Sequence, residues 1–140
     1  MILEDIMAYI DGGHLRGMLE CSHWDTVLDV LNEARAQKVQ DLYHLGGIDN
    51  HLELQLDFMR NLFRPQITIA GRESRYYYNP EAPLKMVDFL DCYEGAIILT
   101  SDFDLILSMA KEYFVTGDVK SLVTRDKLPE IPFDEEEDDE

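Results

Sequence analysis

Residues 96–104 read AIILTSDFD, in which four apolar residues are followed by a threonine, a serine and two aspartates. A short apolar run bounded by turn residues is typical of a strand buried on both faces of a sheet. A second such run, MAYI at residues 7–10, leads into Asp11 and two glycines. The two runs predict an α/β fold in which helices cover both faces of a mostly parallel sheet.

The acidic ends of these two runs predict a metal site. Ligands of open parallel sheets bind beyond the carboxyl ends of the strands, where the strand order reverses. We therefore expect Asp11, Asp102 and Asp104 to converge at one edge. Carboxylates at close range repel one another unless a cation neutralises them. A set of oxygen ligands favours Mg2+ or Mn2+ as the shared ion.

The same aspartates have a simpler alternative role. An aspartate that follows a strand often caps the next helix by accepting a hydrogen bond from a backbone N–H. Asp102 or Asp104 has this role if the helix predicted at residues 105–113 begins directly after them. The sequence leaves capping and metal binding as alternatives at these positions.

The rest of the chain predicts alternating helices and strands. Apolar spacings favour helices at residues 24–37, 50–63 and 84–93, with Pro65 ending the second. Strands are predicted at residues 39–45, 66–70, 75–78 and 119–124. A turn at residues 71–74 joins the middle two strands into a hairpin arm. We expect a single domain over residues 1–128, followed by a disordered acidic tail at residues 129–140.

The charge of the chain argues against tight, non-specific binding to nucleic acid. The formal net charge is -17, and residues 134–140 are seven consecutive acids, which leaves -10 on the rest. Affinity for nucleic acid normally rests on lysine and arginine side chains that neutralise phosphates. A metal-bridged contact with a single phosphate remains compatible with this charge.

The two cysteines and the hydropathy predict a cytoplasmic protein without a membrane span. Cys21 and Cys92 lack the spacing of metal ligands and are expected to be reduced thiols. No stretch approaches the eighteen or so apolar residues that a membrane helix needs.

Three short motifs occur in order along the chain. Residues 10–15 read IDGGHL, residues 85–88 read KMVD and residues 100–104 read TSDFD. This order resembles the NYN domain, a branch of the PIN-like ribonuclease fold, which typically shows I-D-G-x-N-L, K-G-V-D and S-G-D-x-D. The similarity runs from about residue 7 to about residue 128. It implies a three-layer α/β/α domain with a central parallel sheet and an acidic cluster that binds Mg2+ or Mn2+.

Carried over by position, the resemblance implies a set of site residues. The acids are Asp11, Asp88, Asp102 and Asp104, and Thr100 stands in place of the family serine. Asp11 and Asp102 are expected to bind the metal, Asp104 to bind a second ion or orient the attacking water, and Thr100 to hold a carboxylate or a phosphate oxygen. Asp91 is the alternative to Asp88, because the segment that follows is about a dozen residues shorter than in the family.

Three functions follow from these motifs. The first is a metal-dependent ribonuclease, in which the ion supplies a nucleophilic water and stabilises charge on the phosphoryl oxygens of RNA. The second is a catalytically inactive NYN-fold module for binding or regulation, favoured by the acidic surface and by His14 where the family has asparagine. The third is a toprim-like phosphoryl-transfer domain that pairs Asp102 with Asp104 and takes Asp11 as its third acid. RNA is the expected partner, and a homodimer is compatible with related folds.

Overall fold

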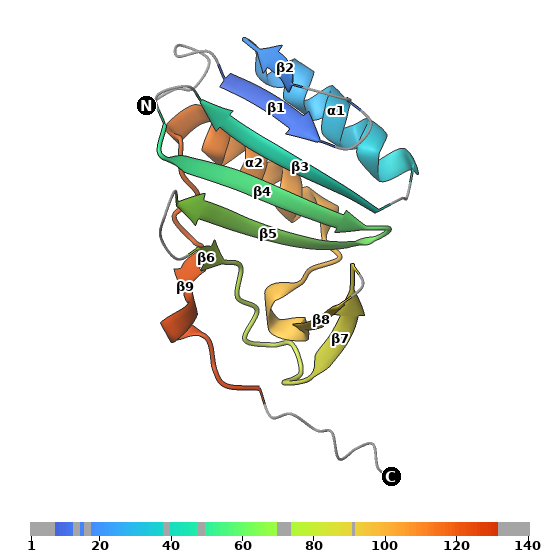
Figure 1. The fold of residues 1–140 in the computed structure, drawn as a ribbon, viewed down its shortest axis with the longest axis vertical. Coiled ribbons are helices and arrows are strands. Elements are labelled where there is room, and N and C mark those ends of the chain that lie inside the picture. Colours follow the sequence, from blue (N-terminus) through green and yellow to red (C-terminus); the bar gives the residue numbers. More distant parts are fainter. Residues whose placement is uncertain are drawn as a thin grey trace.

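The centre of the structure is an antiparallel sheet with the strand order β2-β1-β3-β4-β5-β6-β9 (Figure 1). The structure is a computed structural model that describes residues 8–12, 15, 18–37, 40–47, 50–69, 74–90 and 92–131. The strands of the sheet are β1 (Ala8–Gly12), β2 (Met18–Cys21), β3 (Gln40–Gly47), β4 (Leu52–Met59), β5 (Leu62–Ile69), β6 (Arg75–Tyr76) and β9 (Val123–Thr124). A second, smaller sheet consists of β7 (Met86–Phe89) and β8 (Cys92–Gly95).

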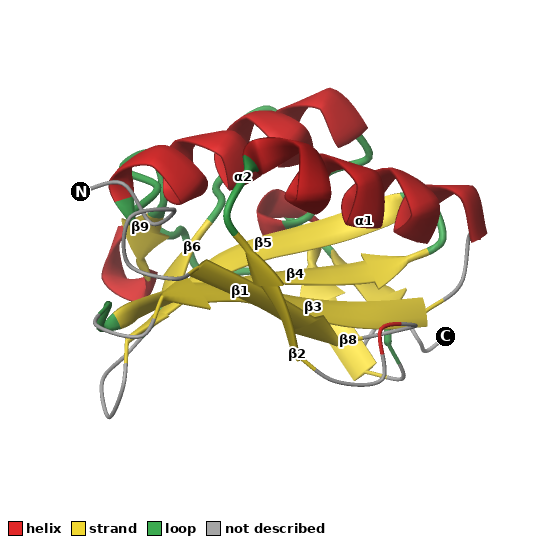
Figure 2. Cartoon of the chain, turned by 90° about the horizontal axis from the view of Figure 1, so that it is seen from above, coloured by secondary structure: helices red, strands yellow, loops and turns green. Residues whose placement is uncertain are grey.

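Two long helices, α1 (Trp24–Gln37) and α2 (Phe103–Thr116), lie on one side of the larger sheet (Figure 2). Two short 3-10 helices, η3 (Ala96–Ile98) and η4 (Arg125–Lys127), lie in the connections before α2 and after β9. We call the side of the larger sheet that faces away from α1 and α2 the open face.

Alternation of apolar and polar residues makes β4 and β5 the central pair of strands. In β4, Leu54, Leu56 and Phe58 are buried on the helix side, and the residues between them point to the open face. A two-residue turn joins β4 to β5, with Arg60 at a φ of 60°. Turns of this length connect antiparallel neighbours, because a parallel connection needs a long crossover.

Aromatic rings between α2 and the sheet form the centre of the main core. The ring of Phe63 lies 4.8 Å from that of Phe58 and 5.7 Å from that of Phe103, measured between centroids. Tyr43 on β3 extends the group, with its ring 5.6 Å from Phe58. Because Phe103 is the first residue of α2, these contacts fix the start of that helix against β4 and β5.

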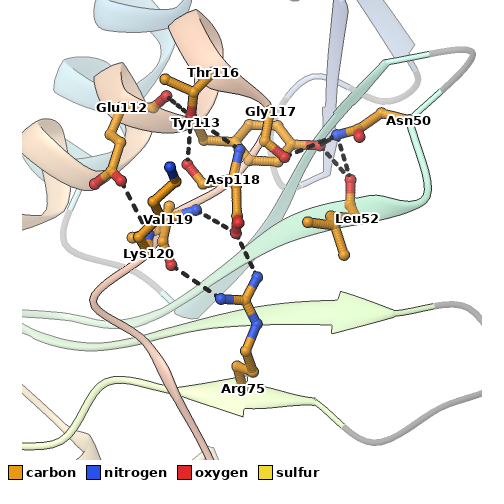
Figure 3. Close-up of polar contacts among 10 residues, drawn as sticks. All are labelled: Asn50, Leu52, Arg75, Glu112, Tyr113, Thr116, Gly117, Asp118, Val119 and Lys120. Atoms are coloured by element: carbon orange, nitrogen blue, oxygen red, sulfur yellow. Dashed lines mark hydrogen bonds and ion pairs between the residues drawn. The ribbon is translucent and has the colours of Figure 1, made fainter. Parts of the chain in front are cut away.

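A polar network holds the other end of α2 (Figure 3). The buried Tyr113 hydroxyl donates to the carbonyl oxygen of Leu52, and the amide of Asn50 donates to the Tyr113 hydroxyl at 2.9 Å and to Gly117 O at 3.1 Å. Burial raises the pKa of Tyr113 above its ordinary value. Arg75 on β6 forms an ion pair with Asp118, just after the helix. These contacts join α2 to β4 and β6.

The smaller sheet packs against the open face at the β4–β5 turn. Its core consists of Phe89 with η3 and the residue after it, packed on Met59, Leu62 and the C-terminal residues Leu128 and Ile131. The backbone N–H of Leu90 donates to the sulfur of Met59 at 3.2 Å. Part of the open face is therefore covered, while the part near β1 and β3 remains accessible.

The predicted fold class is wrong. Every strand pair that the described residues form is antiparallel, and α1 and α2 cover one face of the sheet instead of two. The structure is thus not a three-layer α/β/α domain with a mostly parallel sheet. The physical reason is that most neighbouring strands are joined by connections of only a few residues, whereas a parallel pair needs a long crossover. The helix α1 does connect two strands of the same direction, β2 and β3, but β1 lies between them.

Several predicted elements also need correction. Residues 50–63 and 84–93 are not helices, because they contain β4 with its turn and the β7–β8 hairpin. The predicted strand before Thr100 is the 3-10 helix η3. The helix predicted at residues 24–37 is confirmed as α1, and the one at residues 105–113 lies within α2. The predicted hairpin of residues 66–70 and 75–78 pairs as expected, but it belongs to the larger sheet and is no separate arm.

The predicted tail falls mostly outside the described residues, as do residues 71–73 of the predicted turn. Residues 129–131 are described, and Ile131 packs in the second core, beyond the predicted domain end at residue 128. Over the described part of the chain, no helix has the length and apolar character needed to cross a membrane.

Candidate functional site

Polar side chains fill the accessible part of the open face. The strand register places residues of four neighbouring strands in rows across it, because side chains of one face alternate along each strand. From β1 to β5, these residues are Tyr9, Asp11, His44, Glu53, Gln55, Asp57, Arg64, Gln66 and Thr68.

Four of these residues form what we call the open-face cluster: Tyr9, Asp11, His44 and Glu53. The hydroxyl of Tyr9 donates to Oε2 of Glu53 at 2.9 Å, and Nδ1 of His44 lies 3.0 Å from Oε1 of the same carboxylate. Asp11 pairs directly opposite His44 in the sheet. The side chains of His44 and Glu53 are 26% and 32% exposed, so this carboxylate is accessible although both its oxygens are engaged.

A glycine on β3 makes room for this arrangement. Gly46 pairs with Tyr9 across the strands, and a Cβ atom at Gly46 would lie 2.5 Å from the Tyr9 hydroxyl oxygen. Real Cβ atoms do not approach so closely, so any side chain at this position would displace the tyrosine. The absence of a side chain lets Tyr9 cross β3 and reach Glu53 on β4.

The cluster shifts the pKa values of its members. The hydrogen bond with Glu53 raises the pKa of His44 against the opposing effect of burial, and the charges of Glu53, Asp11 and Asp57 add to the rise. The same hydrogen bond lowers the pKa of Glu53. Burial, followed by the hydrogen bond to Glu53, raises the pKa of Tyr9 to about 12. A proton on His44 would therefore neutralise part of the negative charge of the cluster.

The contribution of His44 to stability is expected to depend on pH. Because the pKa of His44 is higher in the folded than in the unfolded protein, its stabilising effect is complete below the ordinary value of 6.5 and is lost as the pH rises through the folded pKa. The lowered pKa of Glu53 means that its effect is lost as the pH falls below 4.5. Urea unfolding of the wild type and His44→Gln should thus differ most between these values. A difference that grows above pH 8 would contradict the ion pair.

A buried ion pair adjoins the cluster. Asp57 on β4 is fully buried, and its carboxylate accepts hydrogen bonds from Nε of Arg64 at 2.8 Å and from the amide of Gln55 at 2.9 Å. Arg64 also pairs with Glu94 on β8, and its guanidinium lies 5.2 Å from the centroid of the Phe89 ring. The two carboxylates raise the pKa of Arg64, although burial acts to lower it. These contacts tie the smaller sheet to the larger one.

The structure does not bring Asp11 together with Asp102. The row through Asp11 crosses β5 at Gln66, whereas Thr100 pairs with Phe63 at the start of β5. The three strand spacings between β1 and β5 alone amount to roughly 14 Å. Ligands of one Mg2+ ion lie within about 2 Å of it. A single ion cannot bridge these aspartates in this arrangement.

The predicted site residues of the motif TSDFD, at residues 100–104, have mainly structural contacts. Oδ1 of Asp102 accepts a hydrogen bond from the backbone N–H of Leu105 at 3.2 Å, so Asp102 is the N-cap of α2, the alternative role considered above. The hydroxyl of Thr100 accepts from the backbone N–H of Asp102 at 3.1 Å. Asp104 is exposed, and it lines a pocket of about 420 Å3 with Asp102 and Arg35.

The remaining predicted acid lies elsewhere. Asp88 is exposed on β7 and pairs with Tyr93 in the smaller sheet. Asp91 and His14 lie outside the described residues. Within the described residues, no three histidine, cysteine, aspartate or glutamate side chains are grouped as metal ligands would be. Binding of Mg2+ or Mn2+ stays an untested prediction.

Sequence reasoning missed the open-face cluster. Glu53 falls within the helix predicted at residues 50–63, which contains the strand β4 in the structure. The available signal was the sequence LELQLDF at residues 52–58, which alternates strictly and places Glu53, Gln55 and Asp57 on one face of a strand.

Comparisons with known proteins inform the fold alone. No family model matches the chain, and no curated protein matches it. The chain is similar to a solved structure described as the crystal structure of a hypothetical protein from Neisseria gonorrhoeae. The TM-score is 0.64 and the sequence identity 12%, over 81% of this chain and 90% of that one. The likeness extends over most of both chains and shows that this antiparallel arrangement also occurs in that protein.

Proposed function

We propose that this chain is a binding module for a positively charged protein partner. The observation that carries the proposal is the charge balance: 29 acidic side chains stand against 12 lysines and arginines. A surface with such an excess attracts a basic partner and speeds its association, and it repels nucleic acid and other polyanions.

Contacts within the protein engage several of its cations. Among the described residues, five lysine or arginine side chains have such contacts. Arg64 and Arg75 form ion pairs with acids. The other three lie over aromatic rings. The distance from the charged group to the ring centroid is 4.8 Å for Arg35 over Phe103, 5.2 Å for Lys111 over Trp24 and 4.8 Å for Arg125 over Tyr76. These cations are less free to contact phosphates than fully solvated ones would be.

Exposed acids gather on α1. Asp25, Asp29 and Glu33 are exposed and four residues apart, so they share one side of the helix. Val27 and Leu31 are buried on the other side. We call the three acids the acidic stripe. It faces away from the core, where a partner has access to it.

The metal-dependent ribonuclease stays a prediction, which the comparisons do not test. Its geometric basis was the convergence of Asp11 with Asp102 and Asp104, and the fold separates the first from the other two. The toprim-like alternative used the same three acids and loses the same basis. For this reason we favour the binding module.

A parallel titration tests the proposal. The full chain is titrated at about 150 mM salt with a short peptide in which lysine alternates with valine. In a separate titration, single-stranded RNA is added in a buffer that contains Mn2+. We expect saturable binding of one peptide, weakening as salt is raised, and neither binding nor cleavage of RNA. The same peptide with glutamate in place of lysine serves as the control. Cleavage of RNA that requires Mn2+ and is lost in Asp102→Asn would overturn the proposal in favour of the ribonuclease.

A further inference from the structure

The strand β2 forms one edge of the larger sheet. Within the described residues, β2 pairs only with β1, with Met18 opposite Asp11 and Cys21 opposite Ala8. An edge strand presents backbone N–H and C=O groups along its outer side, and an extended segment of another chain can pair with them. In the part of the chain that the structure describes, no strand occupies this outer edge.

The β2 edge has fewer of the features that block such pairing than the opposite edge of the sheet. Proteins protect edges with lysine, proline, bulges or very short strands. At the opposite edge, β9 has only two residues and is followed by Arg125, Lys127 and Pro129. By contrast, β2 contains neither lysine nor proline, and its Met18 and Leu19 are 64% and 37% exposed. Exposed apolar side chains on an unprotected edge are typical of an interaction surface.

Acids surround this apolar edge. Glu20 is exposed on the open-face side of β2, opposite Tyr9, and α1, which carries the acidic stripe, lies on the other side at the same end of the sheet (Figure 1). On a helix, residues four apart are about 6 Å apart along the axis. Every second residue of a strand lies about 6.8 Å from the next on the same face. A strand with a basic residue at every second position presents all of these residues on one side, at a spacing that matches the acidic stripe.

We propose that the positively charged partner binds by adding a basic strand to the outer edge of β2. The inference rests on the proposed function and specifies its surface. The added strand forms backbone hydrogen bonds with β2, its apolar residues pack on Met18 at the open face, and its lysine or arginine residues lie on the helix side, where they face the acidic stripe. A second copy of this chain fits less well, because two acidic edges would face each other.

The test uses the lysine–valine peptide and a version methylated at alternate backbone nitrogens. Methylation removes N–H donors and keeps every charge, so strand addition predicts a roughly tenfold loss of affinity. Hydrogen exchange at residues 18–21 should slow when the unmodified peptide binds. Met18→Ser should weaken binding, whereas the matched control Leu84→Ser, at a residue 51% exposed and outside the larger sheet, should not.

The outcomes separate the two proposals. Equal binding of both peptides, with unchanged exchange at residues 18–21, would overturn strand addition and leave the binding module intact. Failure of the unmodified peptide to bind would overturn both. Sedimentation of the chain alone tests whether a second copy occupies the edge. If the chain forms a dimer and Leu19→Lys dissociates it, the edge belongs to a second copy and the inference is overturned.

Discussion

Arg64→Met is expected to lower the free energy of unfolding by about 3–5 kcal/mol, because it leaves the Asp57 carboxylate buried without a counter-charge. Asp57 is fully buried, and the Arg64 guanidinium donates two hydrogen bonds to its carboxylate, from Nε at 2.8 Å and from Nη2 at 2.5 Å. Methionine retains much of the side-chain volume, so the loss reports mainly on charge. Urea unfolding at neutral pH measures it.

Two controls make this result specific. Arg35→Met removes a cation that is exposed over the Phe103 ring and should cost about 1 kcal/mol or less. The double variant Asp57→Asn with Arg64→Met should recover part of the loss, because the uncompensated charge is gone. A cost below about 1 kcal/mol for Arg64→Met alone would contradict the buried ion pair.

Phe58→Ala should lower the free energy of unfolding by about 3–5 kcal/mol through loss of buried ring area and creation of a cavity. Phe58 is 1% exposed and contacts the rings of Tyr43, Phe63 and Phe103. The matched control is Leu42→Ala, at a residue 39% exposed on β3, which should have a much smaller effect. Equal losses at the two positions would contradict the assignment of Phe58 to the core.

The sequence predicted α1 and α2 because their apolar residues have a helical period and no competing one. In α1, Val27, Val30, Leu31 and Ala34 all face the core, and no residue nearby breaks the helix. For α2, the N-cap Asp102 and the left-handed Gly117 at the C-terminal end are both visible in the sequence. Local signals of this kind suffice for a helix, since its hydrogen bonds are local.

The β4–β5 hairpin could not be recognised while its residues were read at a helical period. Leu52, Leu54, Leu56 and Phe58 alternate, but Met59, Leu62 and Phe63 extend the apolar set so that it also covers one side of a helix. Pro65 then resembled a helix terminator. It lies instead within β5, next to the short β6, where one missing N–H costs little. The turn at Arg60 contains no glycine and so gave no turn signal.

The candidate site depended on strand pairing, which a single sequence does not specify. His44 and Glu53 are nine residues apart and meet only because β3 and β4 pair in one register. Asp11 and Asp102 were both placed correctly after apolar runs, but the runs belong to different parts of the fold. The parallel sheet that would have brought them together was inferred from the two apolar runs, and the antiparallel sheet replaces it.

A comparison of two variants with equal net charge tests the central claim most directly. In the first, the acidic stripe is neutralised as Asp25→Asn, Asp29→Asn and Glu33→Gln. In the second, three exposed acids elsewhere are neutralised as Glu81→Gln, Asp88→Asn and Glu130→Gln. Thermal melts of both variants establish that they are folded before the lysine–valine peptide is titrated at about 150 mM salt.

A docking surface next to α1 predicts that the first variant loses roughly tenfold in affinity, or about 1.4 kcal/mol. The second should remain within about twofold of the wild type, because its acids lie away from the bound peptide and are screened beyond about 8 Å. Equal weakening of both variants would mean that only the net charge attracts the peptide, and this result would contradict a binding module with a defined surface.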